Sequence, residues 1–117
     1  MEVQIGQKAP HESFRRLLVK LAYVVHTEYM TKKFQEILDA CKIDYYTRWE
    51  NATGKGHGTE PHLGRGSYPS TNSVIMIAFK EEAPLQALTQ MIRDANAEIK
   101  RPSDRIRLFQ LPLELMV

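Results

Sequence analysis

Two short runs of residues, 17–25 and 73–79, restrict the fold most, because each is apolar at odd and even positions alike. Lys20 is the single charged residue within the first run. Successive side chains of a β-strand point to opposite faces of its sheet, so a strand of this kind is stable only where both faces are covered. Both runs are therefore predicted to be interior strands.

Two further segments have the pattern of strands at the margin of a sheet. Residues 44–51 are aromatic and alternate between two sides, as expected of a half-exposed strand. Residues 105–117 are strand-like, but Pro112 has no N–H to donate to a neighbouring strand. The last strand is therefore predicted to lie at an edge.

Helices are predicted in the two longer connections. Residues 28–41 carry apolar side chains at the spacing of one helical face, with Thr27 or Thr31 available as the N-cap. A second apolar stripe follows Pro84, which suits a first helical turn, and Pro102 is expected to end that helix. The order βαββαβ predicts an α+β, ferredoxin-like fold: a four-stranded antiparallel sheet with two helices on one face and a long loop between strands two and three.

Two helices can cover only one face of such a sheet, although its interior strands are apolar on both. Residues 15–117 are predicted to form this single domain, and residues 1–14 a polar N-terminal arm. Association with further copies of the chain is the simplest way to cover the second face. The alternative is that the N-terminal arm or the C-terminal segment folds back over the sheet.

Size and composition exclude several classes of protein. The 117 residues suit one domain, and a net charge of +2 is too small for nucleic-acid binding by bulk electrostatics, so no nucleic-acid partner is expected. No run approaches the roughly 20 apolar residues of a membrane span, so no membrane insertion is expected. The single cysteine, Cys41, is predicted to be a core residue and suits a reducing compartment, which indicates a cytoplasmic protein.

A loop between the second and third predicted strands holds five of the six glycines. Glycine at this density predicts backbone with positive φ, or backbone that closely approaches a ligand. We expect glycine N–H groups and nearby cations to bind a small anion, a nucleotide among the candidates. The predicted ligand-binding residues are Gly54, Lys55, Gly56, Gly58, Gly64, Arg65, Arg105 and Arg107. For Arg105 and Arg107 the alternative is a merely solvated strand face.

Two other chemistries are considered for the same residues. His57 and His62, with Glu60 between them, could ligate a divalent metal, although a loop does not fix their geometry. A small dimeric ferredoxin-like enzyme would need a general base such as His26 or His57. No combination of nucleophile, base and paired carboxylates can be assembled from the sequence, so we expect no enzyme.

The chain resembles the P-II-like signalling proteins over residues 15–117. The βαββαβ order carries the resemblance, together with the pattern Gly-x-Gly-x-Gly, Pro-x-x-Gly-x-Gly, Pro-x-x-Asn that ends at Pro69 and Asn72. It implies a homotrimer whose sheets face the centre and small effectors bound in clefts between subunits. We expect no cofactor to be required. Residues 52–71 would correspond to the family's mobile T-loop, which acts on a partner protein. The related divalent-cation-tolerance proteins imply the metal-binding trimer as the alternative.

Overall fold

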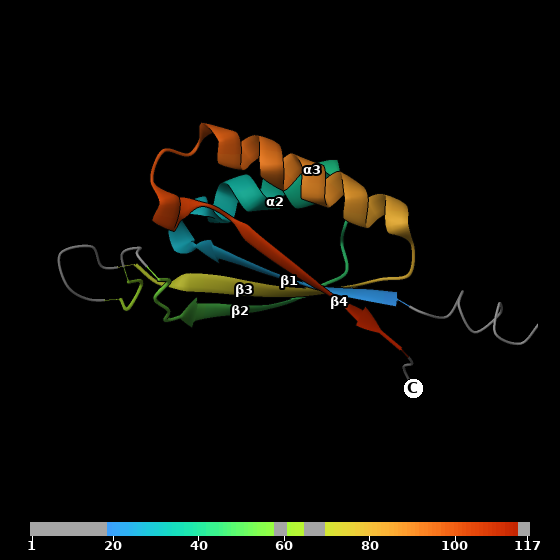
Figure 1. Cartoon of the computed structure of the whole chain (residues 1–117), viewed down its shortest axis with the longest axis horizontal. Helices are drawn as coiled ribbons and strands as arrows, with labels where there is room; N and C mark the ends of the chain where they lie inside the picture. The colour runs from blue at the N-terminus through green and yellow to red at the C-terminus, as the bar shows by residue number, and fades with distance from the viewer. Residues whose placement is uncertain (1–18, 58–60, 65–69, 115–117) are drawn as a thin grey trace, which may run out of the picture.

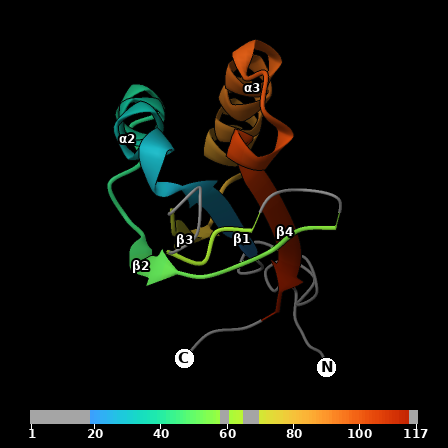
Figure 2. The ribbon, with the colours of Figure 1, turned by 90° about the vertical axis from the view of Figure 1, so that its left-hand side faces the viewer.

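Four strands, two α-helices and two 3-10 turns make up the computed structural model, which describes residues 19–57, 61–64 and 70–114. In chain order they are β1 (Val19–Thr27), η1 (Glu28–Met30), α2 (Thr31–Ala40), β2 (Thr47–Ala52), β3 (Asn72–Phe79), α3 (Glu82–Glu98), η2 (Pro102–Asp104) and β4 (Arg107–Leu113). The strands form one antiparallel sheet in the order β2-β3-β1-β4, and both helices lie on the same side of it (Figures 1 and 2). The predicted ferredoxin-like fold is confirmed, with β1 and β3 inside the sheet and β4 at an edge.

The helices begin and end differently from the prediction. The segment 28–41 is a 3-10 turn followed by α2, and the Thr27 side chain caps the turn by accepting a hydrogen bond from the Tyr29 N–H at 3.3 Å. At the other end of the chain, α3 stops at Glu98, before the predicted terminator Pro102. Pro102 instead begins the short turn η2.

The core lies between the helices and the sheet. Alternate residues of the two interior strands face it, and they pack against the apolar stripes of α2 and α3. The largest buried core side chains are Phe34, Ile37, Leu38, Ile43, Ile75, Ile77, Phe79, Leu88 and Ile106. Cys41 is partly buried beside them, and burial raises the pKa of its thiol.

The other side of the sheet, which we call the open face, carries the remaining strand side chains. Pairing across the strands sets Tyr23 beside Met76 and Phe109, and Val25 beside Val74. The described side chains on this face are Leu21, Tyr23, Val25, Thr47, Trp49, Val74, Met76, Ala78, Arg107, Phe109, Leu111 and Leu113. Trp49, Phe109 and Leu111 are 49%, 56% and 50% exposed. Apart from Thr47 and Arg107, the described side chains of the open face are apolar or aromatic. The N-terminal arm, as an alternative cover, falls outside the described residues.

No helix in the described part of the chain has the length and apolar character needed to span a lipid bilayer.

Candidate functional site

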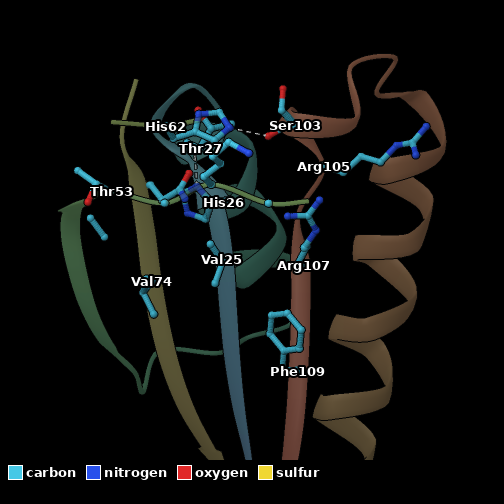
Figure 3. A pocket seen from close by; sticks show the side chains of 15 residues that line it. Val25, His26, Thr27, Thr53, His62, Val74, Ser103, Arg105, Arg107 and Phe109 are labelled. Carbon is cyan, nitrogen blue, oxygen red and sulfur yellow. Dashed lines mark hydrogen bonds between the residues drawn. The ribbon is translucent and has the colours of Figure 1, made fainter. Parts of the chain in front are cut away.

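A pocket of about 340 Å³ opens at the end of the sheet where the glycine-rich loop begins and returns (Figure 3). Its walls are the end of β1, the start of β3, the base of the loop, and the segment from η2 into β4. The pocket therefore joins four segments that are distant in sequence. It lies at the end of the sheet where the antiparallel topology brings together the loop and the turn between α3 and β4.

Of the described residues, three with cationic side chains line this pocket: Lys55 from the loop, Arg105 from the turn after η2, and Arg107 from β4. All three are exposed, and within the described residues none forms an ion pair or a side-chain hydrogen bond. No described carboxylate lines the pocket. As far as the described residues go, this is a cluster of positive charge without a carboxylate beside it, and such a cluster favours an anion.

The base of the loop is held by backbone hydrogen bonds. The Gly54 N–H donates to the His62 carbonyl at 2.9 Å, and the His62 N–H donates to the Gly54 carbonyl at 2.6 Å. The N–H of Gly64 donates to the Ser70 carbonyl at 2.8 Å. The N–H groups of Gly54 and Gly64 are therefore paired within the chain, and the part of these two glycines in binding a ligand stays a prediction.

The predicted role of the glycines also changes. Among the described glycines only Gly64 has positive φ, at 74°. Gly54 lies in a close contact instead: a Cβ there would lie 3.1 Å from the Asn72 Nδ2, so the Asn72 side chain would have to shift slightly. Gly58 and Arg65 lie outside the described residues, so their part in the site stays a prediction.

The two candidate metal ligands are in different environments. His57 is exposed in a turn, whereas His62 is only 5% exposed and has both ring nitrogens hydrogen-bonded. Its Nδ1 lies 2.5 Å from the Ser70 Oγ and its Nε2 lies 3.0 Å from the Ser103 carbonyl oxygen. Among the described residues no group of three His, Cys, Asp or Glu side chains could hold a metal ion. The described residues therefore offer no support for the metal site.

His26 is a core residue rather than a positioned base. It is 1% exposed, its ring centroid lies 5.1 Å from that of Phe34, and its Nδ1 lies 2.7 Å from the Thr27 carbonyl oxygen. Burial lowers the pKa of His26, the Arg48 charge lowers it further, and the hydrogen bond to Thr27 opposes both. The imidazole is therefore held neutral, and its Nε2 has no partner within the described residues.

Several residues that shape the pocket were missed by reasoning from sequence. Ser70 and Ser103 position His62, and Asn96 at the end of α3 fixes the start of β4. The Asn96 Nδ2 donates to the Ile106 carbonyl, and the Ile106 N–H donates to the Asn96 Oδ1, both at 2.8 Å. These are single polar residues whose partners lie well away in the sequence, and no local pattern marks them.

A second hollow, of about 530 Å³, lies at the other end of β2 and β3. Tyr45, Tyr46, Met76 and Ala78 contribute to it, with Lys80 as its single cation among the described residues. Its lining is mainly aromatic and apolar, so it is a poorer candidate for an anion than the pocket at the loop.

Comparison with known proteins finds solved structures of the same fold. No family model matches the chain, and no curated protein matches its sequence. Among solved structures, CPII from Thiomonas intermedia K12 bound to ADP and bicarbonate superimposes with a TM-score of 0.60 at 14% identity, covering 83% of this chain and 89% of that one. A further CPII structure, of a nitrogen regulatory PII-like protein bound to ADP, AMP and bicarbonate, gives a TM-score of 0.56 at 13% identity, with 86% and 97% covered.

A protein from Thermus thermophilus that is assigned to the PII-like signalling proteins gives a TM-score of 0.53 at 16% identity, covering 83% of this chain and 88% of its own. Similarity at these identities establishes the fold. The chain has the ferredoxin-like fold of the PII-like proteins, as the loop pattern and element order predicted.

Proposed function

We propose that this protein is a non-catalytic, PII-like sensor that binds a small anionic effector at the base of the 52–71 loop and acts through that loop on a partner protein. The observation that carries the proposal is the convergence of Lys55, Arg105 and Arg107 on one pocket without a described carboxylate. Three unneutralised cations at one site repel each other, and a bound anion would relieve that repulsion.

A nucleoside phosphate suits the pocket best. Its phosphate oxygens would meet the cations, and its base would lie on the apolar wall formed by Val25, Val74 and Phe109. The volume of about 340 Å³ lies within the range usual for small-molecule sites. CPII, which shares the fold, binds ADP, AMP and bicarbonate, and these are the first ligands to test.

We further propose that the protein is a homotrimer in which the open faces meet. The support is the apolar surface on the open face, including Trp49, Phe109 and Leu111, each about half exposed in one chain. Because Val25, Val74 and Phe109 belong both to this face and to the pocket wall, a neighbouring copy on the open face would border the pocket. The effector would then bind beside a subunit boundary.

The proposal is tested by thermal unfolding with ADP, AMP, bicarbonate and, as a control for ionic strength, chloride. A ligand at 100 times its Kd stabilises the folded state by about 2.7 kcal/mol, which is a readily measured rise in Tm. Calorimetry on the best ligand then gives stoichiometry and affinity. If none of the three ligands raises the Tm above the chloride control, the anion-sensor proposal fails.

A further inference from the structure

We propose that His62 is the positioning residue of the anion pocket. It holds the turn that carries Arg105 against the loop segment that carries Lys55, so that both residues line one pocket. This inference rests on the proposed function, since it concerns the same pocket. His62 is the histidine that the sequence suggested as a metal ligand, and its contacts point to a different role.

The hydrogen-bond partners of the His62 ring define its tautomer. The Ser103 carbonyl oxygen can only accept, so the Nε2 that lies 3.0 Å from it carries the hydrogen. In the neutral ring Nδ1 is then an acceptor, and the Ser70 hydroxyl donates to it. Both ring nitrogens thus have a hydrogen-bond partner, and His62 is 5% exposed. The hydrogen bonds therefore define one tautomer and one ring orientation.

The hydrogen bonds of His62 connect two walls of the pocket. The backbone of His62 is paired in both directions with Gly54, whose next neighbour is Lys55. Its ring reaches Ser103, forty-one positions away in sequence and two residues before Arg105 (Figure 3). One buried residue thus links the loop wall of the pocket to its C-terminal wall.

Contacts of their own side chains with described residues do not hold Lys55 and Arg105 in place. Within the described residues, neither Lys55 nor Arg105 has a side-chain hydrogen bond or ion pair, and both are exposed. Their relative position depends on the backbone that carries them, and the His62–Ser103 bond joins those two pieces of backbone. Loss of that bond would let the turn move away from the loop, which separates charges that must act on one ligand.

Two substitutions separate the two ring contacts. In His62→Gln the side-chain Nε2 can occupy the place of the ring Nε2 and donate to Ser103, whereas in His62→Asn the shorter amide reaches only the Ser70 side. Both variants lose one ring hydrogen bond, so their loss of thermal stability is expected to be similar. Exposed His57→Asn, in the same loop, is the matched control.

ADP is the first probe and bicarbonate the second, with affinity measured by calorimetry on the full chain. We expect His62→Gln to bind within about threefold of the wild type and His62→Asn to bind about tenfold or more weakly, since one well-placed hydrogen bond governs about one power of ten in affinity. His57→Asn is expected to bind as the wild type does. In the ligand-free protein, the NMR amide signals of Ser103 and Arg105 should shift in His62→Asn and stay near their wild-type positions in His62→Gln.

The outcomes distinguish this inference from the function on which it rests. If the wild type binds ADP or bicarbonate and His62→Asn binds it equally well, His62 is a structural residue and the inference is overturned while the sensor function stands. If His62→Gln and His62→Asn lose affinity equally, the specific link to Ser103 is wrong. If the wild type binds neither probe, it is the proposed function that fails, and the positioning role falls with it.

Discussion

Single residues of the pocket differ in how directly they would meet an anion. Arg107→Ala and Arg105→Ala are each expected to weaken ADP binding by about tenfold, the lower end of the range for a charge-assisted hydrogen bond, because both side chains are exposed to screening solvent. Arg93→Ala, an exposed arginine on α3 outside the pocket, is the matched control. Calorimetry measures the affinity of the three variants for ADP. Equal affinities would show that Arg105 and Arg107 are merely solvated and do not contact the anion.

Gly64 is the residue whose conformation most restricts substitution. Its φ of 74° is unfavourable for any residue with a Cβ, and that Cβ would lie 3.2 Å from the Thr71 Cγ2. Gly64→Ala is therefore expected to reduce the free energy of unfolding by about 1–2 kcal/mol. Gly56→Ala, at a glycine without positive φ, should leave it nearly unchanged. Denaturant unfolding measures the free energy of unfolding of both variants. If Gly64→Ala unfolds with the free energy of the wild type, the conformation described for Gly64 is contradicted.

His26 predicts how stability depends on pH. Its pKa is lowered in the folded state from the ordinary 6.5, so below pH 6.5 the unfolded chain takes up a proton that the folded chain does not. The free energy of unfolding should therefore decrease as pH falls from 6.5 toward the lowered pKa. In His26→Asn, whose Nδ2 can still donate to the Thr27 carbonyl, this contribution to the slope should disappear. Urea unfolding at several pH values between about 5 and 8 tests it, and parallel curves for the two proteins would disprove it.

At the level of elements, the connection from α3 to β4 places Arg105 and Arg107. Asn96, partly buried at the end of α3, makes two hydrogen bonds with the backbone of Ile106, which is itself 2% exposed. Asn96→Ala is expected to lower the free energy of unfolding by about 2–3 kcal/mol, since two buried backbone groups lose their partner. Asn96→Asp keeps an acceptor for the Ile106 N–H but sets a carboxylate near the carbonyl oxygen, so it should recover little stability. Denaturant unfolding measures both variants, and full stability of either would contradict the geometry.

The elements also show what could be predicted from the sequence. The strands and helices followed from local periodicity, because β1 and β3 are apolar along most of their length and the helix stripes recur at regular spacing. Helix ends were less predictable: Thr27 capping a 3-10 turn and the early end of α3 depend on backbone geometry that no periodic pattern encodes. The pocket could be predicted only in part. Its three described cations were predicted from charge and glycine density, but the contacts of His62 with Ser70 and Ser103 join distant segments and appear only in the folded chain.

For the whole molecule, the open face matters most, because the described residues of one chain do not cover it. Burial of apolar surface stabilises by about 25 cal/mol per Å², so an apolar sheet face left in water favours association. The trimer proposal predicts that light scattering at micromolar concentration gives three times the mass of one chain. A monodisperse monomer would contradict it, and a dimer would favour the small-enzyme arrangement considered from the sequence.

The same proposal predicts which residues hold the assembly together. Met76 lies within the open face, paired between Tyr23 of β1 and Thr47 of β2, so Met76→Glu would bury a carboxylate without a partner wherever another copy covers that face. We expect Met76→Glu to dissociate the trimer while leaving the helix-side core of each chain intact, because Met76 points away from that core. Ala87→Glu, at an exposed position of α3, is the control and should remain trimeric.

The pocket borders the open face through Val25, Val74 and Phe109. A folded Met76→Glu monomer should therefore also bind ADP more weakly. Retention of wild-type affinity by that monomer would mean that the pocket of one chain is complete without its neighbour.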